Sequence, residues 1–434
     1  MESQSPLFSR AALLVVLLLV LAACGGGSNE SRGAVPEDTI PYQHPEYWPL
    51  SKGSSRYPFL VHYRTNSELS MVEEIITNLD NAWRVEIEIQ GNTPPPSDQG
   101  FCGPDGRFDV FVWRGYSRCE VDVVSTAPRT AWGGQASFMK IDPWGPYGGE
   151  LLGATVAHEF NHAVHAANDW DEIPIAFEMC ASYVEQFFGP VASYSVMDFQ
   201  AMADWGLLRT DSKYATWYMY GSALYIHFLR DCYLHGDDGW LPELWVSMRN
   251  QGPDFTVNTP HFVNAVDGLL RPVGGTFLDS LPAFARWRYY AGLRDDGQHF
   301  RRLPTQWTQH AFLPEATLAI PQVTLANLSR PLAPAPMLTG CSYLEVKRSS
   351  EAQTSFQVAL QAPVVPGVRW VVQAVPGLVS GKDGDLVDLS AGPARVAFAP
   401  GGKRTLVLIP VPTTAYDPNH QSDTRYPASL VLAP

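Results

Sequence analysis

The segment from His158 to His162 reads His-Glu-Phe-Asn-His and holds the residue types that a hydrolytic metal site needs. Two histidines four residues apart on a helix lie one above the other, so both imidazoles can reach one ion. Glu159 follows the first histidine, where it can act as a general base toward water bound to that ion. Apolar neighbours favour burial, and an unligated His-Glu-His cluster is costly there. The segment therefore predicts a catalytic Zn²⁺ site.

The motif needs a helix to hold it, and the surrounding sequence predicts one over about residues 150–167, where apolar residues recur at helical spacing. Residues 168–171 interrupt this pattern. A second helix is predicted over about 175–188, after Pro174 and before Gly189. The connection between the helices is long enough for the chain to reverse direction, so side chains of both can meet at the ion.

A catalytic zinc ion usually takes three protein ligands, so one more is needed. A third histidine six residues after His162 would continue the same helix, but residue 168 is asparagine. The second helix offers Glu178 and, seven residues later near the same face, Glu185. Glu178 is the preferred ligand, and a solvated or supporting carboxylate is the favoured interpretation of Glu185. His165 is interpreted as a neighbour of the cleft or a surface histidine rather than a ligand.

The second helix reads Phe-Glu-Met-Cys-Ala-Ser-Tyr-Val-Glu from residue 177 to residue 185. Together with the His-Glu-x-x-His motif it resembles exported bacterial zinc metallopeptidases of the gluzincin group. The resemblance implies zinc bound by His158, His162 and Glu178, with Glu159 as the base, in a zincin-like domain. Two positions depart from the pattern. Met179 stands where relatives usually have glycine, and Ser182 stands where thermolysin-like enzymes often have an aspartate that orients a histidine.

The same resemblance suggests two further parts of the site. The segment 214–223 is similar to a Tyr-Gly helix start in those relatives and makes Tyr220 the candidate that stabilises the oxyanion, with Tyr218 second. Aromatic packing is an equally good interpretation of both residues. By analogy with the family, the strand predicted over 136–141 is a possible edge strand, to which a substrate could add in extended form.

The N-terminus has the features of an export signal. An apolar run from Ala11 to Ala23 follows Arg10 and is too short to span a bilayer. It ends in Leu-Ala-Ala-Cys, which resembles the bacterial lipobox and makes Cys24 the expected lipidation site. Gly25-Gly26-Gly27 begins a flexible tether after it. The alternative is an ordinary signal peptide in which Cys24 has no role.

Composition narrows the possible partners. The chain has 434 residues and a formal net charge of −14, and nucleic-acid binding is not expected because it needs clustered basic residues. Five cysteines follow Cys24, and an exported protein can form disulfides. Cys102 with Cys119 and Cys180 with Cys232 are possible pairs, and the odd number leaves at least one thiol unpaired.

The pattern of elements predicts an α+β chain with two folded domains. Strands are expected near 58–63, 108–113, 121–125 and 136–141, and a helix near 68–86. Further helices are expected up to about residue 292. Beyond about 310 short alternating runs separated by turns suggest a β-sandwich. The expected boundaries are a signal at 1–23, a tether at 24–55, a zincin-like catalytic domain at 56–305 and an all-β sandwich-like domain at 306–434.

These observations lead to one expectation and two alternatives. The expectation is an exported zinc metallopeptidase that is lipid-anchored in the bacterial cell envelope and hydrolyses polypeptide substrates. The first alternative is a surface binding lipoprotein whose metal site is structural or inactive. The second is a zinc hydrolase that acts on a non-peptide substrate.

Overall fold

The first sheet of this computed structural model has five strands in the order β1-β2-β3-β5-β4. They are β1 (Leu50–Gly53), β2 (Phe59–Tyr63), β3 (Phe108–Val112), β4 (Cys119–Val123) and β5 (Ser137–Ile141). β2, β3 and β5 are parallel, whereas β1 and β4 run antiparallel to their neighbours. Every residue of β2, β3 and β5 is buried, as expected for strands covered on both faces. The four strands predicted in this region are confirmed.

The structure describes residues 35–434 except 37, 147, 189–193, 210–215, 252–257, 295, 297, 301–316, 376–384, 388, 390–391, 415 and 417–422. The predicted signal segment and Cys24 lie outside the described residues. None of the helices in the described part of the chain is both long and apolar enough to cross a membrane. Contacts group the described residues from Pro41 to Pro434 into one compact unit.

Two expectations about the first sheet are wrong. The edge strand is β4 and not β5, because the chain forms β4 at the outside and then returns to place β5 between β3 and β4. Order also begins earlier than predicted. Short 3-10 helices cover Pro41–Gln43 and Pro45–Tyr47, and β1 pairs with β2 inside the segment expected to be a tether.

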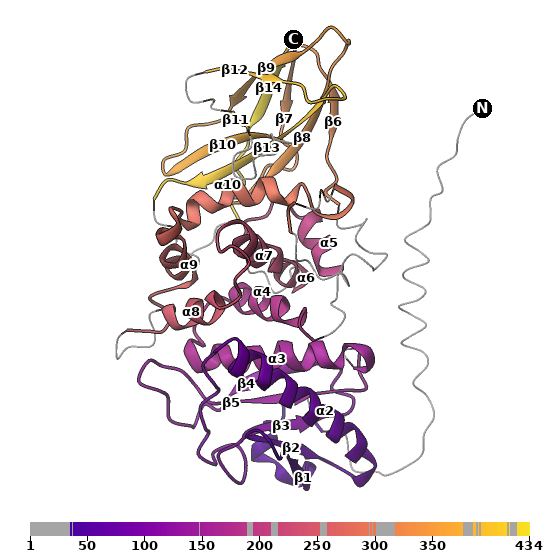
Figure 1. Cartoon of the computed structure of the whole chain (residues 1–434), viewed down its shortest axis with the longest axis vertical. Coiled ribbons are helices and arrows are strands. Elements are labelled where there is room, and N and C mark those ends of the chain that lie inside the picture. The colour runs from indigo at the N-terminus through magenta and orange to yellow at the C-terminus, as the bar shows by residue number, and fades with distance from the viewer. Residues whose placement is uncertain are drawn as a thin grey trace, which may run out of the picture. The chain divides into compact units, whose positions relative to one another are not determined.

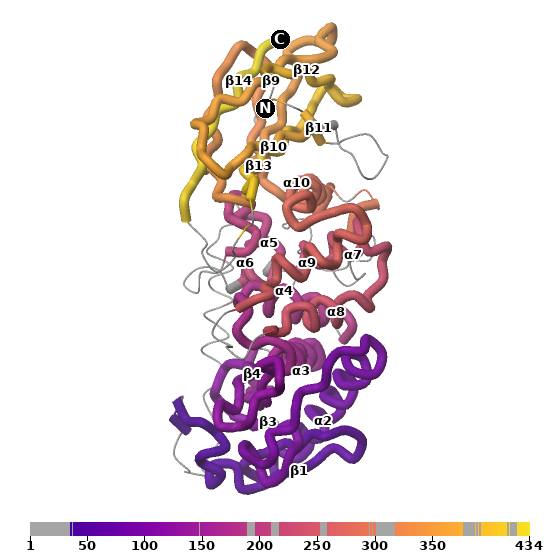
Figure 2. The backbone as a smooth tube through the Cα atoms, turned by 90° about the vertical axis from the view of Figure 1, so that its left-hand side faces the viewer, coloured from indigo at the N-terminus to yellow at the C-terminus, as the bar shows by residue number. Residues whose placement is uncertain are grey.

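The helices that matter for the site are α2 (Leu69–Trp83), α3 (Leu152–Asn168) and α4 (Pro174–Glu185). α3 packs on α2, β4 and β5 and also on α4, which in turn contacts α6 and α7 (Figure 1). Figure 2 shows the same succession from the side, with α4 between α3 and α7. The remaining helices are α5 (Tyr194–Ala201), α6 (Thr216–Gly221), α7 (Ala223–Cys232), α8 (Trp240–Ser247), α9 (Phe262–Leu270) and α10 (Phe277–Arg288).

The C-terminal part contains two more sheets. One has the order β11-β10-β13-β8-β6 and the other β12-β9-β14-β7. Their bounds are β6 (Gln322–Thr324), β7 (Leu328–Pro331), β8 (Ser342–Lys347), β9 (Ser355–Gln361), β10 (Val368–Val375), β11 (Asp385–Val387), β12 (Ala394–Ala397), β13 (Lys403–Pro412) and β14 (Ser429–Ala433). Side chains from both sheets form one hydrophobic cluster, so the sheets face each other. The chain is therefore α+β.

The larger hydrophobic cluster joins the first sheet, the helices and the outer face of β13. Val407, Ile409 and Val411 belong to it, and α10 contacts both β10 and β13. The domain boundary at 305/306 stays a prediction, since residues 301–316 are outside the described residues. All five cysteines after Cys24 are free thiols, so neither disulfide is present.

A buried carboxylate holds the turn between α3 and α4. Glu172 accepts hydrogen bonds from the backbone N–H groups of Ile173 and Phe262, each at 2.7 Å. Burial raises the pKa of Glu172 from 4.5 to about 7, more than these hydrogen bonds lower it. The turn therefore ties the start of α4 to the start of α9.

This carboxyl predicts a pH dependence of stability. Between pH 4.5 and 7 the folded chain holds a proton on Glu172 that the unfolded chain has released, so stability falls as pH rises. Between pH 5 and pH 8, the free energy of unfolding of the wild type should fall by about 2–3 kcal/mol more than that of Glu172→Gln. Urea unfolding at both pH values measures this, with exposed Glu150→Gln as the control. Equal pH dependence of wild type and Glu172→Gln would contradict the assignment.

Candidate metal centre

Three side chains predicted as ligands meet between α3 and α4. The His158 and His162 Nε2 atoms are 3.1 Å apart. Glu178 Oε2 lies 3.2 Å from His158 Nε2 and 3.7 Å from His162 Nε2. The helical spacing stacks the two imidazoles on one face of α3, and α4 brings the carboxylate to them from the facing helix. The structure therefore brings together the three residues that the sequence had pointed to.

The size of this triangle can be compared with the bonds that zinc makes. Its circumscribed radius is about 1.9 Å, so a point slightly out of its plane lies about 2.0 Å from all three atoms, which matches Zn–N and Zn–O bond lengths. Two nitrogens and one carboxylate oxygen are also a donor set that zinc accepts, and it leaves a fourth position free. The residues present fit a zinc ion.

The other nitrogen of each imidazole also has a partner. His158 Nδ1 donates to Glu185 Oε1 at 2.7 Å, and His162 Nδ1 lies 3.4 Å from His165 Nδ1. Such contacts orient a metal-binding histidine and fix its tautomer. Glu185 thus supports His158. His165 is fully buried and stacks on Trp245 at 3.8 Å between ring centroids, so it is not a surface histidine.

Burial and neighbouring charges set the protonation of these groups. Burial opposes the charged form of His158, but hydrogen bonds to Glu178 and Glu185 raise its pKa well above 6.5. Burial lowers the pKa of His162 to about 4. Burial also acts on Glu178, yet its hydrogen bond with His158 and the histidine charges lower its pKa overall. The cluster therefore favours ionised carboxylates around a positively charged His158 imidazole.

Glu159 lies among the candidate ligands without being one of them. Burial raises its pKa to about 8, and its electrostatic neighbours are His158, Glu178 and Glu185 together with Glu120 on the edge strand β4. Its Oε2 atom is buried and has no hydrogen-bond partner among the described residues. An unsatisfied carboxylate oxygen beside a triangle of ligands is the arrangement that a base acting on bound water requires.

The two tyrosine candidates behave differently. The Tyr220 ring lies 5.3 Å from the His158 ring, and its hydroxyl donates to the Glu178 carboxylate. Tyr218 is buried in the helical core, and its hydroxyl donates to the carbonyl of Gly206 at 2.9 Å. Tyr220 is therefore at the site and Tyr218 has a packing role.

One supporting contact was not foreseen from the sequence. Asn161, between the two histidines, donates from Nδ2 to Glu86 Oε2 at 2.8 Å. Glu86 is fully buried in the π-helical segment Arg84–Ile89 that follows α2, and burial raises its pKa well above 4.5. The signal in the sequence was a glutamate at an inward position of a predicted amphipathic helix.

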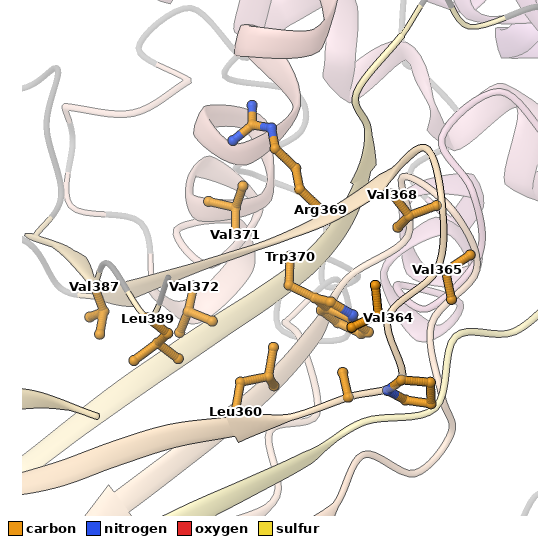
Figure 3. Close-up of a pocket in the computed structure, with 12 residues that line it drawn as sticks. Leu360, Val364, Val365, Val368, Arg369, Trp370, Val371, Val372, Val387 and Leu389 are labelled. Carbon is orange, nitrogen blue, oxygen red and sulfur yellow. The ribbon is translucent and has the colours of Figure 1, made fainter. Parts of the chain in front are cut away.

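A cavity of about 390 Å³ opens near β9 and β10 in the C-terminal sheets. Trp370, Leu360 and Leu389 line it, and Arg369 extends from the opposite side of β10 (Figure 3). Among the described residues that line this cavity, Arg369 is the only charged one, and arginine does not exchange its proton near neutral pH.

The geometry predicts different losses for the two glutamates of α4. Glu178→Ala removes a candidate ligand, whereas Glu185→Ala removes only a supporting contact to His158 and should weaken Zn²⁺ binding by roughly 10- to 100-fold. Competition with a chromophoric chelator measures the Zn²⁺ affinity of both variants. The variant His158→Ala is the control that shows how much zinc binds elsewhere on the chain. Glu185→Gln, which keeps an acceptor for His158 Nδ1, should recover part of the loss. A larger loss for Glu185→Ala than for Glu178→Ala would reverse the assignment.

No known protein family matches the sequence, and no curated protein is significantly similar to it.

Proposed function

We propose that this protein is an exported zinc metallopeptidase that is lipid-anchored in the bacterial cell envelope through Cys24. The observation that carries the proposal is the triangle of His158, His162 and Glu178 with the unsatisfied carboxylate of Glu159 beside it. The first sheet and helices α2 to α4 agree with a zincin-like catalytic domain, in which an active-site helix packs on a mixed sheet. The two facing C-terminal sheets agree with an appended sandwich-like domain.

Three side chains would bind the ion, and two further residues would orient the imidazoles among them. His158, His162 and Glu178 bind it, while Glu185 and His165 hold the two imidazoles in orientation. Zinc in such a site lowers the pKa of a bound water and polarises a carbonyl group. A dication here would also compensate the carboxylates buried around it.

Glu159 is assigned the proton transfers. A neighbouring cation favours the ionised carboxylate, which counteracts the effect of burial on its pKa. Its Oε2 atom can then take a proton from water and pass it to the leaving amine. Tyr220, whose hydroxyl is next to the ligands, is assigned to stabilise the oxyanion of the attacked carbonyl.

The edge strand β4 is assigned to substrate binding. At the two ends of β4, Val124 N–H donates to the carbonyl of Ala136, and the carbonyl of Arg118 accepts from Asp142 N–H, on the side of β5. Along a strand the backbone groups of successive residues point to alternate sides. Cys119, Val121 and Val123 therefore direct their backbone groups to the free edge next to α3. An extended polypeptide could pair with them, which favours a peptide over another substrate class.

The role of Glu159 can be tested by an isosteric change. Glu159→Gln keeps the volume of the side chain and removes the base, so we expect zinc content to stay unchanged and kcat for casein-type substrates to fall by roughly 10²–10⁴-fold. Peptide-release assays and metal analysis measure the two outcomes. Glu150→Gln, an exposed change on the same stretch of chain, is the control. Unchanged hydrolysis would refute the role, and no hydrolysis by the wild type would favour the binding-lipoprotein alternative.

The role of β4 can be tested at Val121. Val121→Pro removes an outward N–H while the bonds to β5 remain, and proline is tolerated at such edge positions. Loss of one main-chain hydrogen bond of about 1 kcal/mol should raise KM by roughly 5-fold. Val121→Ala trims the same side chain but keeps the N–H, so its KM should match the wild type. Equal KM values for the two variants would exclude pairing at this position.

A further inference from the structure

A second cluster of ligand-type side chains lies on the other face of the first sheet. Side chains alternate along a strand, and Phe108, Val110 and Val112 of β3 belong to the core under α3. Asp109 therefore faces the opposite side. There Asp98, Cys102 and Asp109 each offer a ligand atom, and these atoms lie within 4.8 Å of one another. The residues are 3%, 6% and 1% exposed, respectively.

The loop before β3 is folded so that it presents these groups. Asp98 accepts hydrogen bonds from the backbone N–H groups of Gly100, Cys102 and Gly103. The backbone of Gly103 lies directly against Asp109, because a Cβ at that position would come within 2.3 Å of Asp109 Oδ1. Asp98 and Gly103 thus position Cys102 over β3, and the cluster is built from two chain segments.

The polar groups of this cluster are only partly satisfied by one another. The Cys102 thiol hydrogen-bonds to Asp109. His62 Nε2 donates to Asp109 Oδ1 at 2.6 Å, and the His62 ring stacks on Phe111 at 4.6 Å between centroids. The second oxygen, Asp109 Oδ2, is buried and has no hydrogen-bond partner among the described residues. Two carboxylates and a thiol are thus buried close together, and burial of charged groups is unfavourable unless a positive charge compensates them.

We propose that Asp98, Cys102 and Asp109 form a second site for a divalent metal ion. A thiolate with two carboxylates suits a borderline ion such as Zn²⁺ better than Ca²⁺ or Mg²⁺, which prefer oxygen alone. His62 orients Asp109 from behind, as supporting groups do in metal sites. Each metal–thiolate bond formed releases the Cys102 thiol proton to solvent. The ion would fasten the loop from Asp98 to the sheet, and this assignment does not depend on the proposed peptidase activity.

Cobalt provides a specific probe, because a thiolate bound to Co²⁺ gives a ligand-to-metal charge-transfer band and none of the three candidate ligands of the His158 site is a thiol. The full chain is stripped with a chelator and titrated with Co²⁺. We expect a band that saturates by two equivalents per chain in the wild type and by one equivalent in His158→Ala, and that disappears in Cys102→Ser. Cys341→Ser, which changes another buried thiol, is the matched control and should keep the band. Metal analysis should find one ion fewer in Cys102→Ser than in the wild type.

The wild-type titration decides the proposal even if Cys102→Ser does not fold. Absence of a charge-transfer band in the folded wild type overturns it, as does a band that survives in Cys102→Ser. Asp109→Asn, which keeps the size of the side chain, should weaken Co²⁺ binding at least 10-fold, and His62→Gln should weaken it by roughly 10- to 100-fold. Loss of hydrolysis in His158→Ala with an intact band would separate the two sites.

Discussion

The arrangement on which the candidate site depends is one imidazole between two carboxylates in the protein interior. Glu178 approaches Nε2 of His158 and Glu185 approaches Nδ1. Both glutamates belong to α4 and are separated by about two turns, so both contacts form only when α4 lies beside α3 in one register. A shift of one residue would rotate each carboxylate by about 100° away from α3. The turn held by Glu172 maintains that register.

Because its surroundings are apolar, this arrangement forms only if its polar groups have partners, and for the same reason those groups keep the partners they have. The motif helix is buried along almost its whole length, so its polar groups cannot turn to water if a partner is lost. Segments far apart in the chain therefore supply partners: Glu86 after α2 reaches Asn161, and Trp245 on α8 covers His165. The helices around the site thus position its polar groups, in addition to filling the core.

The sequence predicted the parts of this fold that depend on local periodicity. The helices carrying His158 and Glu178 follow from spacing, and loop length implied that they meet. The order of the strands could not be predicted from local periodicity. The chain returns from β4 to place β5 inside the sheet, and contacts between residues distant in sequence decide that return. The short strand β1 is partly exposed and lacks a clear apolar alternation, so the sequence predicted that it was part of the flexible tether. The contacts of Asn161 with Glu86 and of His165 with Trp245 depend on how helices pack, which one sequence does not reveal.

Strand β3 connects the two clusters through its alternation. Val110 packs into the core beneath the motif helix, while its neighbour Asp109 faces the second cluster. The electrostatic neighbours of Asp109 are His62, Asp98 and Asp105, and those of Glu159 are His158, Glu178, Glu120 and Glu185. Among the described residues these two sets of neighbours have no member in common, and groups without common partners contribute nearly additively. Cations bound at the two proposed sites, on opposite faces of one sheet, would therefore act independently: one would support the proposed chemistry, and the other would hold the loop that leads into β3.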